Sequence, residues 1–219
     1  MIIHIRDLID ASIMFPFIFL MLWLIVWLII QIMIVKKEKI QFFKKILDNT
    51  IFNVIVVIGW VVFVFLLIPF SHQRLITGQF TLILDLFGQI LIVLGIITFI
   101  WLFIQKRGIG AQEMGKLLTK GAYGISRHPI YLGHMFVFFG LVFERGAFDA
   151  LILSPIIIFI YIITAKIEEK FSIGNIFKEE YEIYRKKVPM FMKWWLFLII
   201  LIIFIIFLLF SFNLGLLQI

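Results

Sequence analysis

The sequence contains no cysteine and few charged residues. The lack of cysteine excludes disulfide bonds, thiolate metal sites and a cysteine nucleophile. Only 15% of the 219 residues are charged, whereas about a quarter of the residues of a soluble domain carry charge. Hydrophobic residues make up 63% of the chain, and the mean hydropathy is +1.15. This composition excludes an ordinary soluble domain and predicts an all-α integral membrane protein.

Long apolar runs are the predicted transmembrane helices. A helix needs about 20 consecutive apolar residues to cross the hydrocarbon core of a bilayer. Four runs reach this length, at 13–35, 51–70, 82–104 and 194–217. Residues 130–165 are expected to form a helical hairpin that turns at residues 144–146, where charged residues cut its first arm short. Together these segments predict about six transmembrane helices.

Basic residues cluster in three segments of the chain. Seventeen of the 20 Lys and Arg residues follow the first run, follow the third run or precede the last run. The positive-inside rule places such segments in the cytoplasm, so Arg6, Arg74, Arg145 and both termini are expected outside. Topology therefore explains the net charge of +7, and no nucleic-acid partner is expected. The short length and the Ile-, Phe- and Lys-rich composition favour a prokaryotic cytoplasmic membrane.

The polar segments divide the chain into three parts. Residues 1–116 hold the first three predicted spans, 117–193 hold the hairpin with the candidate site, and 194–219 are a predicted C-terminal transmembrane helix. Two polar segments, 105–129 and 166–193, flank the hairpin and meet at its cytoplasmic end. Connections of this length in a small protein are usually functional. The glycines expected to permit close helix packing are Gly59, Gly88, Gly95, Gly133 and Gly140.

The first candidate motif is Arg-His-Pro-Ile-Tyr-Leu-Gly, which begins at Arg127. Pro129 suits the first turn of a helix, so Arg127 and His128 are expected at a helix N-terminus, where anions bind well. Tyr131 lies four residues after Arg127, on the same helix face. His134 continues this stripe one turn deeper, where a packing role is expected. Anchoring or capping explains each residue alone, but the combination is much more specific.

The second motif is the adjacent pair Glu168-Glu169, followed by a polar segment that is expected to be helical and to end at Pro189. Two carboxylates at the end of an apolar helix are costly unless they are paired or solvated. Solvation at the membrane surface is the simpler explanation of the pair. Arg127 or a cationic ligand is the expected partner if the pair is functional.

Together the two motifs resemble the signature of the isoprenylcysteine carboxyl methyltransferase family, and related phospholipid methyltransferases share much of the pattern. The resemblance covers residues 117–189, and both motifs occur in the expected order. It implies an integral membrane methyltransferase with S-adenosylmethionine as its cofactor, held at the cytosolic face. It also implies a lipid-like or prenylated acceptor that approaches through the bilayer.

The resemblance also supplies candidate site residues and roles. Arg127 would pair with a carboxylate of the cofactor or the acceptor, and His128 would add a polar contact. Tyrosine rings would face the sulfonium, and Glu168 or Glu169 would accept hydrogen bonds from the cofactor. The catalytic candidates are Arg127, Glu168 and Glu169, and no metal is expected. The cofactor-binding candidates are Tyr123, Arg127, His128, Tyr131, Glu168, Glu169, Tyr181 and Tyr184.

The chain departs from the family pattern in four places. Ala122 stands where proline is common, and Lys178 stands where glycine usually follows the phenylalanine. The spacing from Glu169 to Phe177 is one residue longer than the pattern. The apolar run at 194–217 is additional.

Several acceptors and functions stay open at this point. A carboxylate acceptor is favoured because it is already nucleophilic at neutral pH, whereas an amine must first lose a proton, for which His134 is a candidate base. A thiol or thioether acceptor is a further alternative. The rival functions are an NADPH-dependent membrane sterol or enone reductase and a non-enzymatic membrane protein. The sequence gives no indication of the oligomeric state.

Overall fold

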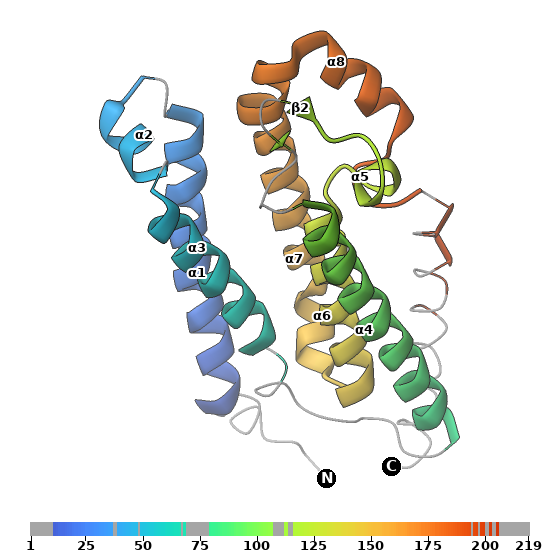
Figure 1. Cartoon of the computed structure of the whole chain (residues 1–219). Coiled ribbons are helices and arrows are strands. Elements are labelled where there is room, and N and C mark those ends of the chain that lie inside the picture. The colour runs from blue at the N-terminus through green and yellow to red at the C-terminus, as the bar shows by residue number, and fades with distance from the viewer. Residues whose placement is uncertain are drawn as a thin grey trace. The chain divides into compact units, whose positions relative to one another are not determined.

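The computed structural model of the chain is mostly helical (Figure 1). It describes residues 11–36, 39–47, 49–66, 68, 79–106, 112–113, 116–193, 195–196, 198–199, 202 and 205. The chain divides into two compact units, Met1–His72 and Gln73–Ile219. The first contains α1 (Ala11–Lys36), α2 (Gln41–Leu47) and α3 (Thr50–Leu66). The second contains α4 (Gln79–Lys106), β1 (Gln112–Glu113), β2 (Lys116–Leu117), α5 (Ala122–Ile125), α6 (Pro129–Arg145), α7 (Phe148–Glu168), the π-helix η2 (Glu169–Ile173) and α8 (Gly174–Lys187).

One helical stretch among the described residues, Leu82–Gln105 within α4, is long and apolar enough to cross a membrane by itself. Large apolar side chains are exposed along it, and Phe103 is 85% exposed. A continuous apolar surface of this kind suits contact with lipid rather than water. The stretch agrees with the span predicted at 82–104. The total of about six spans stays a prediction, and most of 194–217 lies outside the described residues.

The first unit pairs apolar helices and carries none of the candidate site residues. Asn49 caps α3, because its Oδ1 accepts a hydrogen bond from the Phe52 N–H at 3.1 Å. Gly59 of α3 faces Trp23 of α1, and a Cβ at Gly59 would lie 3.1 Å from the indole ring. The packing role expected for Gly59 is therefore confirmed within this unit.

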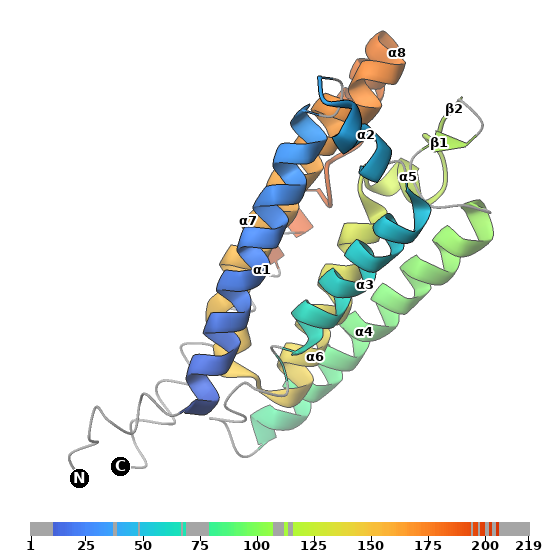
Figure 2. The same ribbon diagram turned by 90° about the vertical axis from the view of Figure 1, so that its left-hand side faces the viewer.

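In the second unit, α4 and α6 lie side by side (Figures 1 and 2). They pack through glycines. A Cβ at Gly88 would lie 2.6 Å from the Gly140 carbonyl oxygen, and a Cβ at Gly95 would lie 2.7 Å from that of Gly133. The two glycines of each helix are seven residues apart and so share one face. Their reverse order of pairing makes the helices antiparallel. The packing role expected for these four glycines is confirmed.

A tight turn joins α6 to α7. Gly146 caps α6 in the left-handed conformation, with a φ of 61°, and its N–H donates to the Phe143 carbonyl at 3.2 Å. These two helices correspond to the hairpin expected over 130–165. The charged residues at 144–145 form the last turn of α6 instead of cutting it short, since side chains at a helix end can reach water.

Figure 1 shows β2, α5 and α8 gathered at one end of the bundle formed by α4, α6 and α7. β1 and β2 form a short antiparallel pair with Gln112 opposite Leu117. α7 continues through η2 into α8. The polar helix expected within 166–193 corresponds to α8, which ends at Lys187, shortly before Pro189. Both candidate motifs therefore reach the same end of the second unit.

Candidate active site

Two distant segments of the chain form the frame of the site. The N–H of Arg127 donates to the Pro189 carbonyl at 2.9 Å, and the N–H of His128 donates to the Met190 carbonyl at 3.0 Å. The Ser126 hydroxyl also donates to the Met190 carbonyl, at 2.9 Å. The segment before α6 is thus fastened to the segment after α8. These two N–H groups are occupied by protein and do not offer the anion site expected at this helix end.

The side chain of Arg127 makes an ion pair with Glu169. Its Nε donates to Glu169 Oε1 at 2.8 Å, and its Nη2 lies 3.4 Å from Oε2. Its Nη1 donates to the carbonyls of Arg185 and Val188 at 2.9 and 2.8 Å, at the C-terminus of α8. The two charged side chains are only 10% and 9% exposed. Arg127 is confirmed as a partner of the glutamate pair, and protein groups occupy its guanidinium.

The imidazole of His128 lies between the two carboxylates. Its Nε2 lies 3.0 Å from Glu169 Oε1, and its Nδ1 lies 3.4 Å from Glu168 Oε2. Burial alone would lower the pKa of His128, but the hydrogen bonds and charges of both glutamates outweigh burial and raise the pKa above its usual value. Burial would likewise raise the pKa of Glu169, yet hydrogen bonds from His128 and Arg127 lower it to about 2.

Glu168 is the accessible carboxylate of the cluster, with a side chain that is 36% exposed. One of its oxygens accepts a hydrogen bond from the Tyr131 hydroxyl at 3.1 Å. The Tyr131 ring stacks parallel to the His128 ring, with centroids 5.4 Å apart. A carboxylate, an imidazole and an aromatic ring therefore lie together, and Glu168 is the most exposed of the charged side chains in this cluster.

Three further tyrosines line the core beneath α8. The Tyr184 hydroxyl donates to the Tyr123 carbonyl at 2.6 Å, which joins α8 to α5. The rings of Tyr181 and Tyr184 meet edge to face at 6.0 Å. Burial and the charge of Glu169 raise the pKa of Tyr181. The Tyr181 hydroxyl is buried near that carboxylate but makes no hydrogen bond with it. A buried hydroxyl beside the cluster is a further group that a cofactor could engage.

Gln105 is a site-forming residue that the motifs did not reveal. Its Oε1 accepts from the Ala122 N–H at 3.0 Å, and its Nε2 donates to the Lys120 carbonyl at 2.7 Å. It thereby holds the turn at Gly121, whose φ is 63° and where a Cβ would collide with the Gln105 amide. The only signal in the sequence was a polar residue at the end of an apolar run.

His134 lies deeper in the hairpin, apart from the charged cluster. Its Nδ1 is hydrogen-bonded to the Tyr161 hydroxyl, and both residues are buried. The Tyr161 ring in turn contacts the Tyr131 ring, with centroids 5.5 Å apart. This geometry agrees with the packing role expected for His134.

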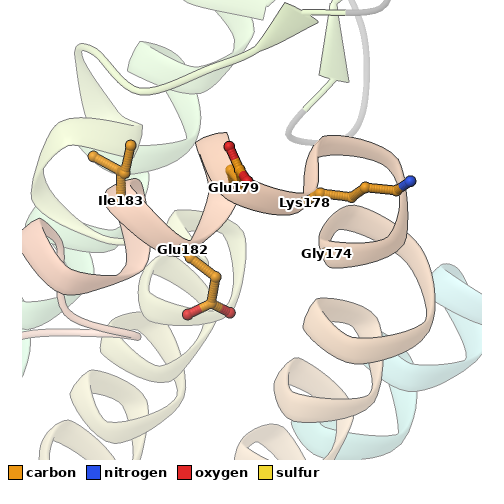
Figure 3. A pocket seen from close by; sticks show the side chains of 5 residues that line it. All are labelled: Gly174, Lys178, Glu179, Glu182 and Ile183. Carbon is orange, nitrogen blue, oxygen red and sulfur yellow. The ribbon is translucent and has the colours of Figure 1, made fainter.

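Lys178 has strained backbone geometry at a bend within α8. Its φ is 40° and its ψ is −110°, and it has the one positive φ outside glycine among the described residues. Glycine adopts this conformation without strain, which accounts for the glycine of the family pattern. The bend borders a shallow pocket of about 580 Å³ (Figure 3). The pocket is lined by Gly174, Lys178, Glu179, Glu182 and Ile183.

A Lys178→Gly variant is expected to be more stable than the parent protein. Relief of the strained φ should raise the free energy of unfolding by about 1 kcal/mol. The matched control is Glu180→Gly at an exposed helical position of α8, where glycine should cost about 1 kcal/mol. Thermal unfolding in detergent measures both changes. A loss of stability in Lys178→Gly would contradict the strain at this residue.

Most residues of the site lie in one continuous stretch of the chain, together with the helices that carry them. Residues 83–180 match the family model of phospholipid methyltransferases. The matched region runs from α4 into α8 and covers less than half of the chain. It includes both glutamates and the Arg-His-Pro motif, and it ends just before Tyr181. No curated protein and no solved structure matches the chain.

The match indicates a methyltransferase associated with a membrane, and members of this family generally use S-adenosylmethionine. The residues of the cluster fit the cationic part of that cofactor. Glu168 is an exposed anion, and the neighbouring Tyr131 offers an aromatic face of the kind that attracts a sulfonium. The cofactor's carboxylate has no comparable partner in Arg127, because protein groups already occupy that guanidinium.

Proposed function

We propose that this chain transfers a methyl group from S-adenosylmethionine to a lipid acceptor at the cytoplasmic surface of the membrane. The observation that carries the proposal is the exposed carboxylate of Glu168, held beside Tyr131 and His128 within the region that matches the methyltransferase family. The segments that join the helices at this end, 116–129 and 166–193, are rich in Lys and Arg, which supports a cytoplasmic location by the positive-inside rule. The apolar surface of α4 supports delivery of the acceptor through lipid.

Methyl transfer requires the protein to align the two reactants and to exclude water from between them. The cofactor would supply an activated methyl group, whose bond to sulfur breaks as the bond to the acceptor atom forms. Such an in-line displacement gains most from positioning and desolvation, and little from acid–base groups. Glu168 would hold the cationic part of the cofactor, and the rings of Tyr131 and His128 would limit its orientation. Arg127 and Glu169 would keep these groups in place.

An amine headgroup is the acceptor that the charges of the site favour. A carboxylate acceptor needs a cationic partner, and protein groups already occupy the guanidinium of Arg127, the residue expected to supply one. A neutral amine needs no such partner, although an ammonium must first lose its proton to water or to a base. Carboxylate O-methylation is the alternative.

Binding of S-adenosylmethionine to the detergent-purified protein tests the proposal. Calorimetry should give saturable binding to the parent protein and no binding to an Arg127→Ala, Glu168→Ala double variant, because both the frame and the exposed anion are lost. NADPH is titrated in parallel. Binding of NADPH without S-adenosylmethionine would overturn the proposal in favour of a reductase.

The acceptor class is tested with radiolabelled cofactor and a membrane lipid extract. Label in an N-methylated lipid survives mild base, whereas label in a methyl ester is released as methanol. Base-stable label would support the amine acceptor. Base-labile label would support the carboxylate alternative and contradict the electrostatic argument.

A further inference from the structure

We propose that Lys186, Lys187 and Lys193 form a docking surface for anionic phospholipids of the surrounding membrane, and that a lipid bound there strengthens cofactor binding. This lipid is distinct from the methyl acceptor and is not consumed. The three residues are called the lysine surface below. Lipid binding stands on the charges and the position of this surface, whereas its effect on the cofactor rests on the proposed function.

The charges of α8 are segregated along the helix. Glutamates occupy its middle, whereas its last turn carries three basic residues and no acidic one. The side chain of Arg185 is engaged with Glu182 at 3.2 Å, and the lysine side chains at 186, 187 and 193 are exposed. Cations at the end of a helix complement its dipole. Lys193 lies outside the helix, so the dipole does not account for the whole surface.

The lysine surface lies where the chain meets exposed apolar residues. Figure 1 shows α8 lying across the end of the bundle formed by α4, α6 and α7. Lys193 directly precedes the predicted C-terminal span, and the nearby Trp195 and Leu196 are 46% and 38% exposed. Tryptophan beside lysine is typical of the headgroup region of a membrane. A lipid satisfies both the cations and the apolar side chains, whereas a nucleic acid or a free anion satisfies only the cations.

The same stretch of chain holds the cofactor site together. Arg127 Nη1 donates to the carbonyls of Arg185 and Val188, which flank the first two lysines. The N–H of Arg127 donates to the Pro189 carbonyl at 2.9 Å, between those lysines and Lys193. An anionic headgroup would reduce the repulsion between the adjacent lysines and so order this backbone. Cofactor binding needs the same ordered backbone, so the two ligands should favour each other.

Lipid binding is tested by native mass spectrometry of the detergent-purified protein with phosphatidylglycerol and, in a parallel titration, phosphatidylcholine. The parent should retain phosphatidylglycerol preferentially, and replacing all three lysines of the surface by glutamine should weaken its binding about tenfold. The matched control replaces three exposed lysines of the first unit, which the predicted topology also places in the cytoplasm: Lys36→Gln, Lys39→Gln and Lys45→Gln. The control should retain phosphatidylglycerol as the parent does. Equal binding by all three proteins, or equal loss in both variants, would overturn the lysine surface as a lipid site.

The effect on the cofactor is measured by calorimetry in nanodiscs of phosphatidylcholine alone or of an equal mixture with phosphatidylglycerol. The parent and the control should bind S-adenosylmethionine about fivefold to tenfold more tightly in the mixed discs, and added salt should reduce this gain. The lysine-surface variant should have the same Kd in both discs. A parent Kd that ignores phosphatidylglycerol would overturn the coupling. Phosphatidylglycerol binding without any cofactor binding would uphold the lipid site and overturn the proposed function together with the coupling.

Discussion

The Arg127→Ala protein is expected to lose about 3–5 kcal/mol of unfolding free energy, the usual effect of breaking a buried ion pair. The loss has two causes. Glu169 stays buried without its arginine partner, and the carbonyls of Arg185 and Val188 lose their donor. Cofactor binding should fall with stability, since the segments at 126–128 and 188–190 are no longer held together. Chemical unfolding and calorimetry measure the two effects.

Two further variants separate the ion pair from a general effect of truncation. Arg145→Ala removes an exposed arginine at the opposite end of α6 and should leave stability nearly unchanged. Adding Glu169→Gln to Arg127→Ala should recover part of the lost stability, because the uncompensated buried charge is gone. Full stability and cofactor binding in Arg127→Ala alone would show that the guanidinium does not hold the frame.

Substitution of Gly140 by alanine is expected to separate α4 from α6. A Cβ at this position would lie 2.6 Å from Ile92 Cγ1, 2.7 Å from the Gly88 carbonyl oxygen and 2.8 Å from the Ile92 nitrogen. Two of these three atoms are backbone, so the helices must move apart, at a cost of about 1–3 kcal/mol. Because α6 carries the Arg-His-Pro motif at its start, cofactor affinity should fall as well.

Gly124→Ala in α5 is the control for this substitution. Its nearest contact would be the Thr119 carbonyl oxygen at 3.4 Å, which is at the limit of ordinary van der Waals distance. Detergent unfolding should therefore give a parent-like midpoint for Gly124→Ala and a lower one for Gly140→Ala. Equal midpoints would mean that the glycine contact between α4 and α6 is not tight.

Local features of the fold were accessible from the sequence because they depend on neighbouring residues. Pro129 begins α6, as its missing N–H favours, and the left-handed Gly146 ends it. The spacing of glycines likewise indicated a close helix contact before its partner helix was known. Charge complementarity also favoured Arg127 as a partner of the glutamate pair, and Glu169 is that partner.

The occupation of Arg127 by protein groups could not be predicted in the same way. Two of its partners are carbonyls of α8, and every residue carries a carbonyl, so the sequence holds no signal for them. The role of Gln105 could not be predicted for a related reason, since its two hydrogen bonds join backbone atoms. The unequal exposure of Glu168 and Glu169 depends on how η2 turns, which adjacent identical side chains do not encode.

The π-helix η2 accommodates an additional residue between Glu168 and α8, the helix that carries Tyr181 and Tyr184. A π-turn holds one residue more than an α-helical turn, and the interval from Glu169 to Phe177, which contains η2, is one residue longer than the related family pattern. In a regular helix one added residue would rotate all that follows by about 100°, and would turn Tyr181 and Tyr184 out of the core. The wide turn can take up an added residue locally, so an insertion within η2 is expected to disturb the site less than the same insertion within α8.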